Sequence, residues 1–175
     1  MNQSQTKRMT SIAAIATIYV VVSLVLNFLS FGPIQVRIAE VLIITAIISK
    51  DGIYGMTLGC FLTNLIGTTM GFSALGIVDV VGGTLLTLVS AIMAYYFRQY
   101  KTKKSKIPLL SLFMPVIFNM FGLPFIFAYI LHDGFVVSVY FSEVLFIFIG
   151  QFISCVVLGY IVFDALKNQL RHYLN

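Results

Sequence analysis

The stretch GPIQVRIAE, residues 32–40, decides how the rest of this chain is interpreted. It places Gln35, Arg37 and Glu40 among apolar residues, in a chain that is 59% hydrophobic and only 10% charged. Polar and charged groups beside hydrocarbon are costly unless they are paired or used. Two interpretations stay open from these residues. Arg37 and Glu40, spaced i, i+3, neutralise each other on one helical face, or the cluster forms the rim of a ligand pocket that faces the outside.

The composition of this 175-residue chain predicts an integral membrane protein. Its mean hydropathy is +1.00, and its apolar fraction exceeds the value of about 45–50% that is typical of soluble domains. Several apolar runs reach the roughly 17–25 residues that cross the hydrocarbon as a helix, and they lack the alternation of barrel strands. We therefore expect an all-α membrane protein in which residues 1–175 form a single integral membrane domain.

Six apolar runs predict six transmembrane helices. Their approximate ranges are 10–29, 33–49, 52–68, 75–97, 108–131 and 137–163. With six spans, ten of the eleven Lys and Arg residues lie on one side, which the positive-inside rule makes cytoplasmic. Both termini are then cytoplasmic, in a multi-pass protein of the cell membrane. The net charge of +5 serves as a topology signal in contact with anionic lipid, so no nucleic-acid partner is expected.

The sequence motifs of catalysis and metal binding are missing. The chain has no GxxxxGK[ST] phosphate loop, no HExxH and no plausible Ser/His/Asp set. Cys60 and Cys155 sit inside apolar runs, without a second Cys or a His at metal-ligand spacing, so a core role is expected for both. We expect no enzyme activity, no cofactor and no metal site, and the chain alone cannot couple ATP hydrolysis to transport.

A small set of polar residues lies in or near the predicted spans. These candidate substrate-binding residues are Gln35, Arg37, Glu40, Asn64, Asp79, Asn119, Glu143 and Gln151. Most of them fall in the outer half of the membrane, which suits a pocket for a polar, planar ligand that is uncharged or cationic. Aromatic side chains that could cover the face of such a ring are Phe72, Tyr140 and Phe141.

Structural roles stay open for the same residues. The amides could make interhelical hydrogen bonds, Asp79 could serve helix packing, and Glu143 could be a solvated charge at a helix start. The third span contains Gly55, Gly59 and Gly67. Such interruptions mark substrate sites in transporters, and they also allow close packing of helices.

Five motifs span most of the chain between residues 32 and 159. They are GPIQVRIAEVL (32–42), GMTLGCFLTNLIG (55–67), DVVGGTLLTLVSA (79–91) and the weaker FNMFGLPF (118–125) and GQFISCVVLG (150–159). These motifs resemble those of the QueT family, the substrate-binding (S) subunits of energy-coupling factor (ECF) transporters. The resemblance implies a six-helix ECF S-component-like bundle that binds a queuosine precursor, a deazaguanine compound, from outside and delivers it to the cytoplasm.

The resemblance also implies partners, namely one transmembrane coupling protein and two ATPase subunits. S subunits present an Ala-x-x-x-Ala surface on the first helix to the coupling protein, and the matching residues here are Ala13, Ala14, Ala16 and Thr17. The chain departs from the family pattern at Gln151, where a glutamate is expected. Two alternatives stay open: an S subunit for another vitamin-like small molecule, and a non-transporting membrane scaffold subunit.

Overall fold

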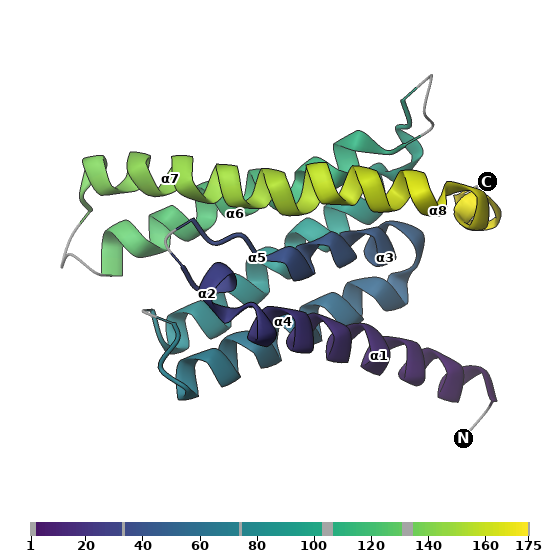
Figure 1. The fold of residues 1–175 in the computed structure, drawn as a ribbon, viewed down its shortest axis with the longest axis horizontal. Helices are drawn as coiled ribbons and strands as arrows, with labels where there is room; N and C mark the ends of the chain where they lie inside the picture. The colour runs from purple at the N-terminus through teal and green to yellow at the C-terminus, as the bar shows by residue number, and fades with distance from the viewer. Residues whose placement is uncertain (1–2, 33, 74, 103–106, 131–134, 175) are drawn as a thin grey trace.

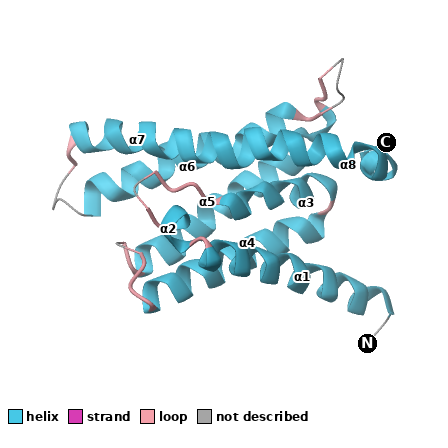
Figure 2. Ribbon diagram, viewed as in Figure 1, coloured by secondary structure: helices cyan, strands magenta, loops and turns pink. Residues whose placement is uncertain are grey.

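The computed structural model describes residues 3–32, 34–73, 75–102, 107–130 and 135–174, which form helices joined by loops (Figure 2). The elements in chain order are α1 (Gln3–Val25), α2 (Asn27–Ser30), the 3-10 helix η1 (Ile38–Leu42), α3 (Ile43–Ile48), α4 (Lys50–Thr69), α5 (Ile77–Tyr96), the 3-10 helix η2 (Phe97–Gln99), α6 (Leu109–Ile130), α7 (Val137–Gln151), the π-helix η3 (Phe152–Leu158) and α8 (Gly159–Leu174). The all-α fold expected from the sequence is thereby confirmed.

Four helices in the described ranges are long and apolar enough to cross a membrane, by length and composition. They are Gln3–Val25, Ile77–Gln99, Leu109–Tyr129 and Val137–Leu166. The expected spans over 33–49 and 52–68 correspond to the short helical stretch Ile38–Ile48 and to α4, neither of which is among these four. The number of six crossings therefore stays a prediction.

The range 33–49, expected as one helix, is helical only from Ile38 onward. Gln35 has a φ of 47°, a left-handed conformation that an α-helix of L-residues does not contain. The backbone here folds in tight turns, in which the Arg37 amide donates to the Gln35 carbonyl at 2.9 Å. A Cβ atom on Gly150 would lie 2.1 Å from the Ile34 carbonyl oxygen, so α7 packs directly on this loop. Irregular backbone at membrane depth is tolerated where protein covers it in this way.

The contacts between α1 and α4 show that these two helices run parallel. Arg8 Nε donates to Asp51 Oδ1 at 3.0 Å near the start of both helices, and further along both a Cβ atom on Gly59 would lie 2.7 Å from Tyr19 Cβ. The segment between them must return through the bundle. It does so, because its far end reaches Gly52, where a Cβ atom would lie 2.1 Å from the Thr45 carbonyl oxygen. The stretch from Phe31 to Ile48 therefore crosses the bundle partly as loop and partly as helix.

The two ends of the bundle differ in charge and shape. We call the end with both termini the basic end (Figure 1), and the cations there include Lys7, Arg8, Lys50, Arg98 and Lys101. At the opposite end lie α2, the turn between α4 and α5, and the start of α7 (Figure 1). In between, η3 joins α7 and α8 into one long rod (Figure 1).

A hydrophobic core joins the helices between the irregular loop (residues 34–37) and the basic end of the bundle. Its large, fully buried side chains include Tyr19, Ile43, Ile47, Met56 and Phe163. The outside of the bundle is also apolar, as large hydrophobic side chains such as Val25 and Phe28 are about 70% exposed. A bundle that is apolar both inside and outside suits a hydrocarbon environment.

Candidate functional site

A cavity of about 240 Å³ lies at the end of the bundle opposite the basic end, and we call this the cavity end. The residues that line it are Phe31, Gly32, Gln35, Ser73, Leu75, Asp79, Phe127 and Glu143. Small-molecule sites usually have volumes of roughly 300–1,000 Å³, so this one suits a compact ligand. Its lining of aromatic rings with a few converging polar groups is typical of binding sites for flat, polar molecules.

Asp79 is the most deeply buried charged group in the cavity wall, at 3% exposed. It lies in the first turn of α5, where the helix dipole favours a carboxylate. Its Oδ2 atom accepts a hydrogen bond from Ser73 Oγ at 3.0 Å and lies 3.9 Å from Nη2 of Arg37. The other oxygen, Oδ1, is buried and has no hydrogen-bond partner in the described part of the chain. One oxygen of this carboxylate is therefore held by protein groups, and the other is buried without a partner.

Gln35 lines the cavity from the irregular loop and is 8% exposed. Its left-handed backbone is held in place by Gly150, whose missing side chain leaves room for the loop carbonyls. Its Oε1 atom is buried without a hydrogen-bond partner among the described residues. A buried polar atom without a partner is costly, and strained backbone tends to occur at functional sites. Gln35 thus brings a second acceptor without a partner to the cavity wall.

Four side chains behind Asp79 form a bridging group, consisting of Arg37, Cys60, Asn64 and Thr87. Three donors converge on the Cys60 sulfur: Thr87 Oγ1 at 3.2 Å, Asn64 Nδ2 at 3.5 Å and Arg37 Nη1 at 3.7 Å. Asn64 Nδ2 also donates to the Asp79 carbonyl at 3.0 Å. The bridging group supports the cavity wall without lining the cavity, so it fixes the position of Asp79.

Glu40 and Gln151 belong to a separate core group with Tyr19 and Cys155. The Tyr19 hydroxyl donates to Glu40 Oε1 at 2.6 Å, and Cys155 Sγ lies 3.5 Å from Gln151 Oε1 and 3.9 Å from the Glu40 carbonyl. All four residues are at most 2% exposed, and none lines the cavity. The ion pair of Arg37 is thus with Asp79 rather than with Glu40, three residues away.

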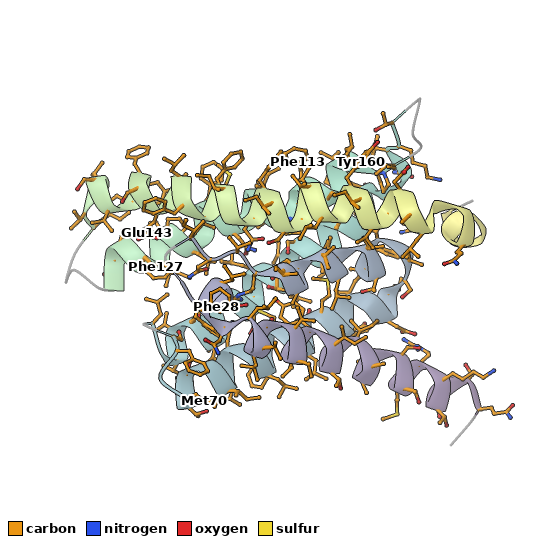
Figure 3. The ribbon with its side chains drawn as sticks, in the orientation of Figure 1. Phe28, Met70, Phe113, Phe127, Glu143 and Tyr160 are labelled. Carbon is orange, nitrogen blue, oxygen red and sulfur yellow. The ribbon has the colours of Figure 1, made fainter. Side chains whose placement is uncertain are left out.

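The remaining candidates divide between the cavity and its surroundings. Glu143 on α7 lines the cavity opposite the loop, and Figure 3 shows it beside Phe127 of α6. Asn119 is buried on α6, at 3% exposed, and does not line the cavity. Of the aromatic candidates, Phe72 packs on Phe31 with ring centroids 6.1 Å apart, whereas Phe141 is 65% exposed. The structure therefore brings Gln35, Asp79 and Glu143 to the cavity itself.

Several residues of the site were not singled out from the sequence. Phe31, Ser73 and Phe127 line the cavity, and Tyr19 holds Glu40. Tyr19 carries a detectable signal, because a buried tyrosine hydroxyl needs a partner and this one lies in the middle of an apolar run. Phe31 and Phe127 carry none, since the chain has 16 phenylalanines in similar apolar surroundings.

Gly55 and Gly59 of α4 and Ala16 of α1 take part in close packing of these two helices. A Cβ atom on Gly59 would lie 2.7 Å from Tyr19 Cβ, and one on Gly55 would lie 2.7 Å from Ile15 Cβ, so α1 and α4 meet through these glycines. Ala16 is buried in this contact, at 3% exposed. The exposed members of the small-residue stretch are Ala13, Ala14 and Thr17.

Comparison with known proteins places the chain beside a family and a curated relative. The family model described as "QueT transporter" matches residues 9–168. The "Queuosine precursor transporter QueT" of Lactococcus lactis subsp. cremoris is 37% identical over 91 residues, which cover 51% of this chain and 50% of the relative. The alignment thus spans about half the length of that curated relative. No solved structure matches the chain.

Proposed function

The chain belongs to the QueT transporter family, and on that premise we propose that it is the substrate-capture subunit of an ECF-type, ATP-driven importer of queuosine precursors. The ligand is a deazaguanine compound that enters the cavity from the outside. The name of the relative supports this ligand class, and the cavity supports a compact, flat molecule. The chain acts as a multi-pass protein of the cell membrane with both termini in the cytoplasm.

The observation that carries this proposal is that two residues with unpaired acceptors line the same cavity as two aromatic rings. Asp79 Oδ1 and Gln35 Oε1 are buried without partners among the described residues, and Phe31 and Phe127 line the same cavity. A guanine-like edge offers adjacent N–H donors and a carbonyl, which a carboxylate and a primary amide can match. The aromatic rings cover the faces of the heterocycle. Binding would then satisfy buried atoms that the protein alone leaves unpaired.

The energy for transport comes from partners in this proposal, because the chain contains no phosphate-binding loop of its own. A transmembrane coupling protein and two ATPase subunits supply it. Ala13, Ala14 and Thr17 are the exposed small residues on α1 that allow close approach of the coupling protein. Ala16 supports this surface from within, through its contact with α4.

Calorimetry on the purified full chain tests the ligand assignment. A 7-deazaguanine base should bind with a measurable heat, and a panel of other vitamins should not displace it. Binding of another vitamin alone would replace the ligand class, and binding of no compound would favour a scaffold role. Uptake into vesicles should require the coupling protein and both ATPases, so uptake by the chain alone would contradict the proposed mechanism.

A further inference from the structure

A second cavity of about 240 Å³ lies where α5 ends and the 3-10 helix η2 follows. The residues that line it are Tyr95, Tyr96, Arg98 and Gln99. Because α5 begins at the cavity end with Asp79, its last turn lies at the basic end of the bundle (Figure 1). We call this second cavity the basic-end cavity. It is separated from the candidate site of the proposed function by the length of α5.

Arg98 is the charged side chain in the lining of the basic-end cavity, and its guanidinium is held in a fixed orientation. The guanidinium carbon lies 3.7 Å from the centroid of the Tyr95 ring, and Nη1 donates to the Tyr95 carbonyl at 2.9 Å. Among the described residues, the structure gives Arg98 this one hydrogen bond and no ion pair. A guanidinium carries five N–H donors in a planar fork. Most of the fork is therefore oriented by protein and open to an anion that accepts two hydrogen bonds side by side, such as a phosphate.

An exposed apolar stripe on α5 leads to the basic-end cavity. Its side chains are between 41% and 65% exposed, and they are Val81, Leu85, Val89, Ile92 and Tyr96. Residues spaced three and four apart lie on one face of a helix, so the stripe follows most of the length of α5. Acyl chains cover such a face in a membrane-spanning bundle, and tyrosines at the end of a span lie at the level of the lipid headgroups. A lipid on this stripe would bring its phosphate to Arg98.

We propose that the basic-end cavity binds the headgroup of an anionic phospholipid, with the phosphate on the Arg98 guanidinium and an acyl chain along the α5 stripe. The charge of the lining selects the lipid class. An anionic headgroup complements Arg98, whereas the choline of a zwitterionic lipid would bring a second cation beside it. Tyr96 and Gln99 are exposed and add hydroxyl and amide donors for the headgroup oxygens. This site is separate from the proposed function and does not depend on the ligand at the cavity end.

Native mass spectrometry of the purified full chain tests the lipid site. The chain in detergent is titrated with dioleoyl phosphatidylglycerol and, separately, with dioleoyl phosphatidylcholine. The first phosphatidylglycerol should bind about 10-fold more tightly or better, as expected for hydrogen bonds between charged groups. Arg98→Gln keeps a donor for the Tyr95 carbonyl and removes the charge, so the preference should fall to within about threefold. Arg98→Lys keeps the charge without the fork and should retain part of the preference.

Lys7→Gln is the matched control, because it removes one cation from an exposed position at the same end of the bundle. It should leave the preference unchanged. Equal binding of the two lipids, an unchanged preference in Arg98→Gln, or an equal loss in Lys7→Gln would overturn the lipid site. Glycerol 1-phosphate, which lacks acyl chains, should compete only weakly, and competition as strong as that of the lipid would assign the cavity to a soluble phosphate instead. Calorimetry with a deazaguanine tests the proposed function separately on the same variants.

Discussion

The buried carboxylates of Glu40 and Asp79 lie in two regions of the molecule, and the surroundings of the charge differ between them. Glu40 lies in the core group, where it accepts from Tyr19 and borders no cavity. Asp79 lies in the cavity wall, where it accepts from Ser73, and in each of the two carboxylates the second oxygen has no partner among the described residues. Both residues are at most 3% exposed, so burial alone does not separate them. What separates them is that Asp79 lines the cavity and Glu40 does not, so we expect Glu40 to stabilise the fold and Asp79 to take part in binding.

The largest effect is expected from Gly150→Ala, which should disturb both the core group around Glu40 and the cavity wall. The new methyl group would lie 2.1 Å from the Ile34 carbonyl oxygen and 2.8 Å from that of Gln35, and backbone atoms cannot yield as a side chain does. We expect the free energy of unfolding to fall by about 1–3 kcal/mol and ligand binding to be lost, because the loop must move. Thermal unfolding and calorimetry measure the two effects. Gly159→Ala is the control, since its nearest neighbour is the flexible end of Leu112 at 3.2 Å, and equal effects would contradict the role of Gly150.

Asp79→Ala should have the next largest effect, and it should act mainly on binding. It removes an acceptor for the ligand and leaves Arg37 buried without its ion-pair partner. We expect a loss of about 2–5 kcal/mol of binding free energy, measured by calorimetry with a deazaguanine. Lys7→Gln on the exposed start of α1 should leave the affinity unchanged. A variant that binds as tightly as the natural chain would place Asp79 with Glu40 as a structural acid.

Tyr19→Phe and Glu40→Gln should show the opposite balance, with a larger effect on stability than on binding. Tyr19→Phe removes the donor of the buried 2.6 Å hydrogen bond, and Glu40→Gln replaces its charged acceptor by a neutral amide oxygen, so we expect each to lower the free energy of unfolding by about 1–3 kcal/mol. Because both changes act on the same interaction, the double variant should lose less than the sum of the two. Unfolding of all four proteins provides the double-mutant cycle. If Glu40→Gln weakened ligand binding as strongly as Asp79→Ala does, the distinction between the two regions would fail.

The smallest effect is expected from Phe127→Leu, which tests whether an aromatic ring in the cavity wall contributes to binding. The change keeps an apolar wall and removes the flat face, so we expect a loss of about 0.5–1.5 kcal/mol of binding free energy. Phe125→Leu on the same helix is the matched control, because Phe125 is 57% exposed and does not line the cavity. The two variants should differ in calorimetry and have similar unfolding temperatures.

The helices could be predicted because length and apolar character act locally. The runs that became α1, α5, α6 and the rod from α7 to α8 are long and continuous enough to cross a membrane. The loop before Ile38 could not be predicted, since it depends on contact with Gly150, more than a hundred residues later. An apolar run gives no sign of such a distant contact.

The polar part of the site could be predicted further than the aromatic part. Gln35, Asp79 and Glu143 were found because acids and amides are rare among apolar residues and costly there. Their division from Glu40 could not be found, because the sequence surroundings of these acids are alike and only tertiary contacts separate them. Phe31 and Phe127 are chosen from many similar rings by the geometry of the bundle alone.

The π-helix η3 has a consequence for the direction in which Glu143 faces. A π-helix winds more residues into each turn than an α-helix, so the seven residues of η3 complete less rotation than they would in regular form. If the same residues were wound as an α-helix, α7 would be turned by roughly 100° about its axis, the angle of one α-helical residue. Glu143 would then point away from the cavity. The π-helix at residues 152–158 thus sets the direction in which the Glu143 carboxylate points from the helix axis, although Glu143 lies more than two helical turns away.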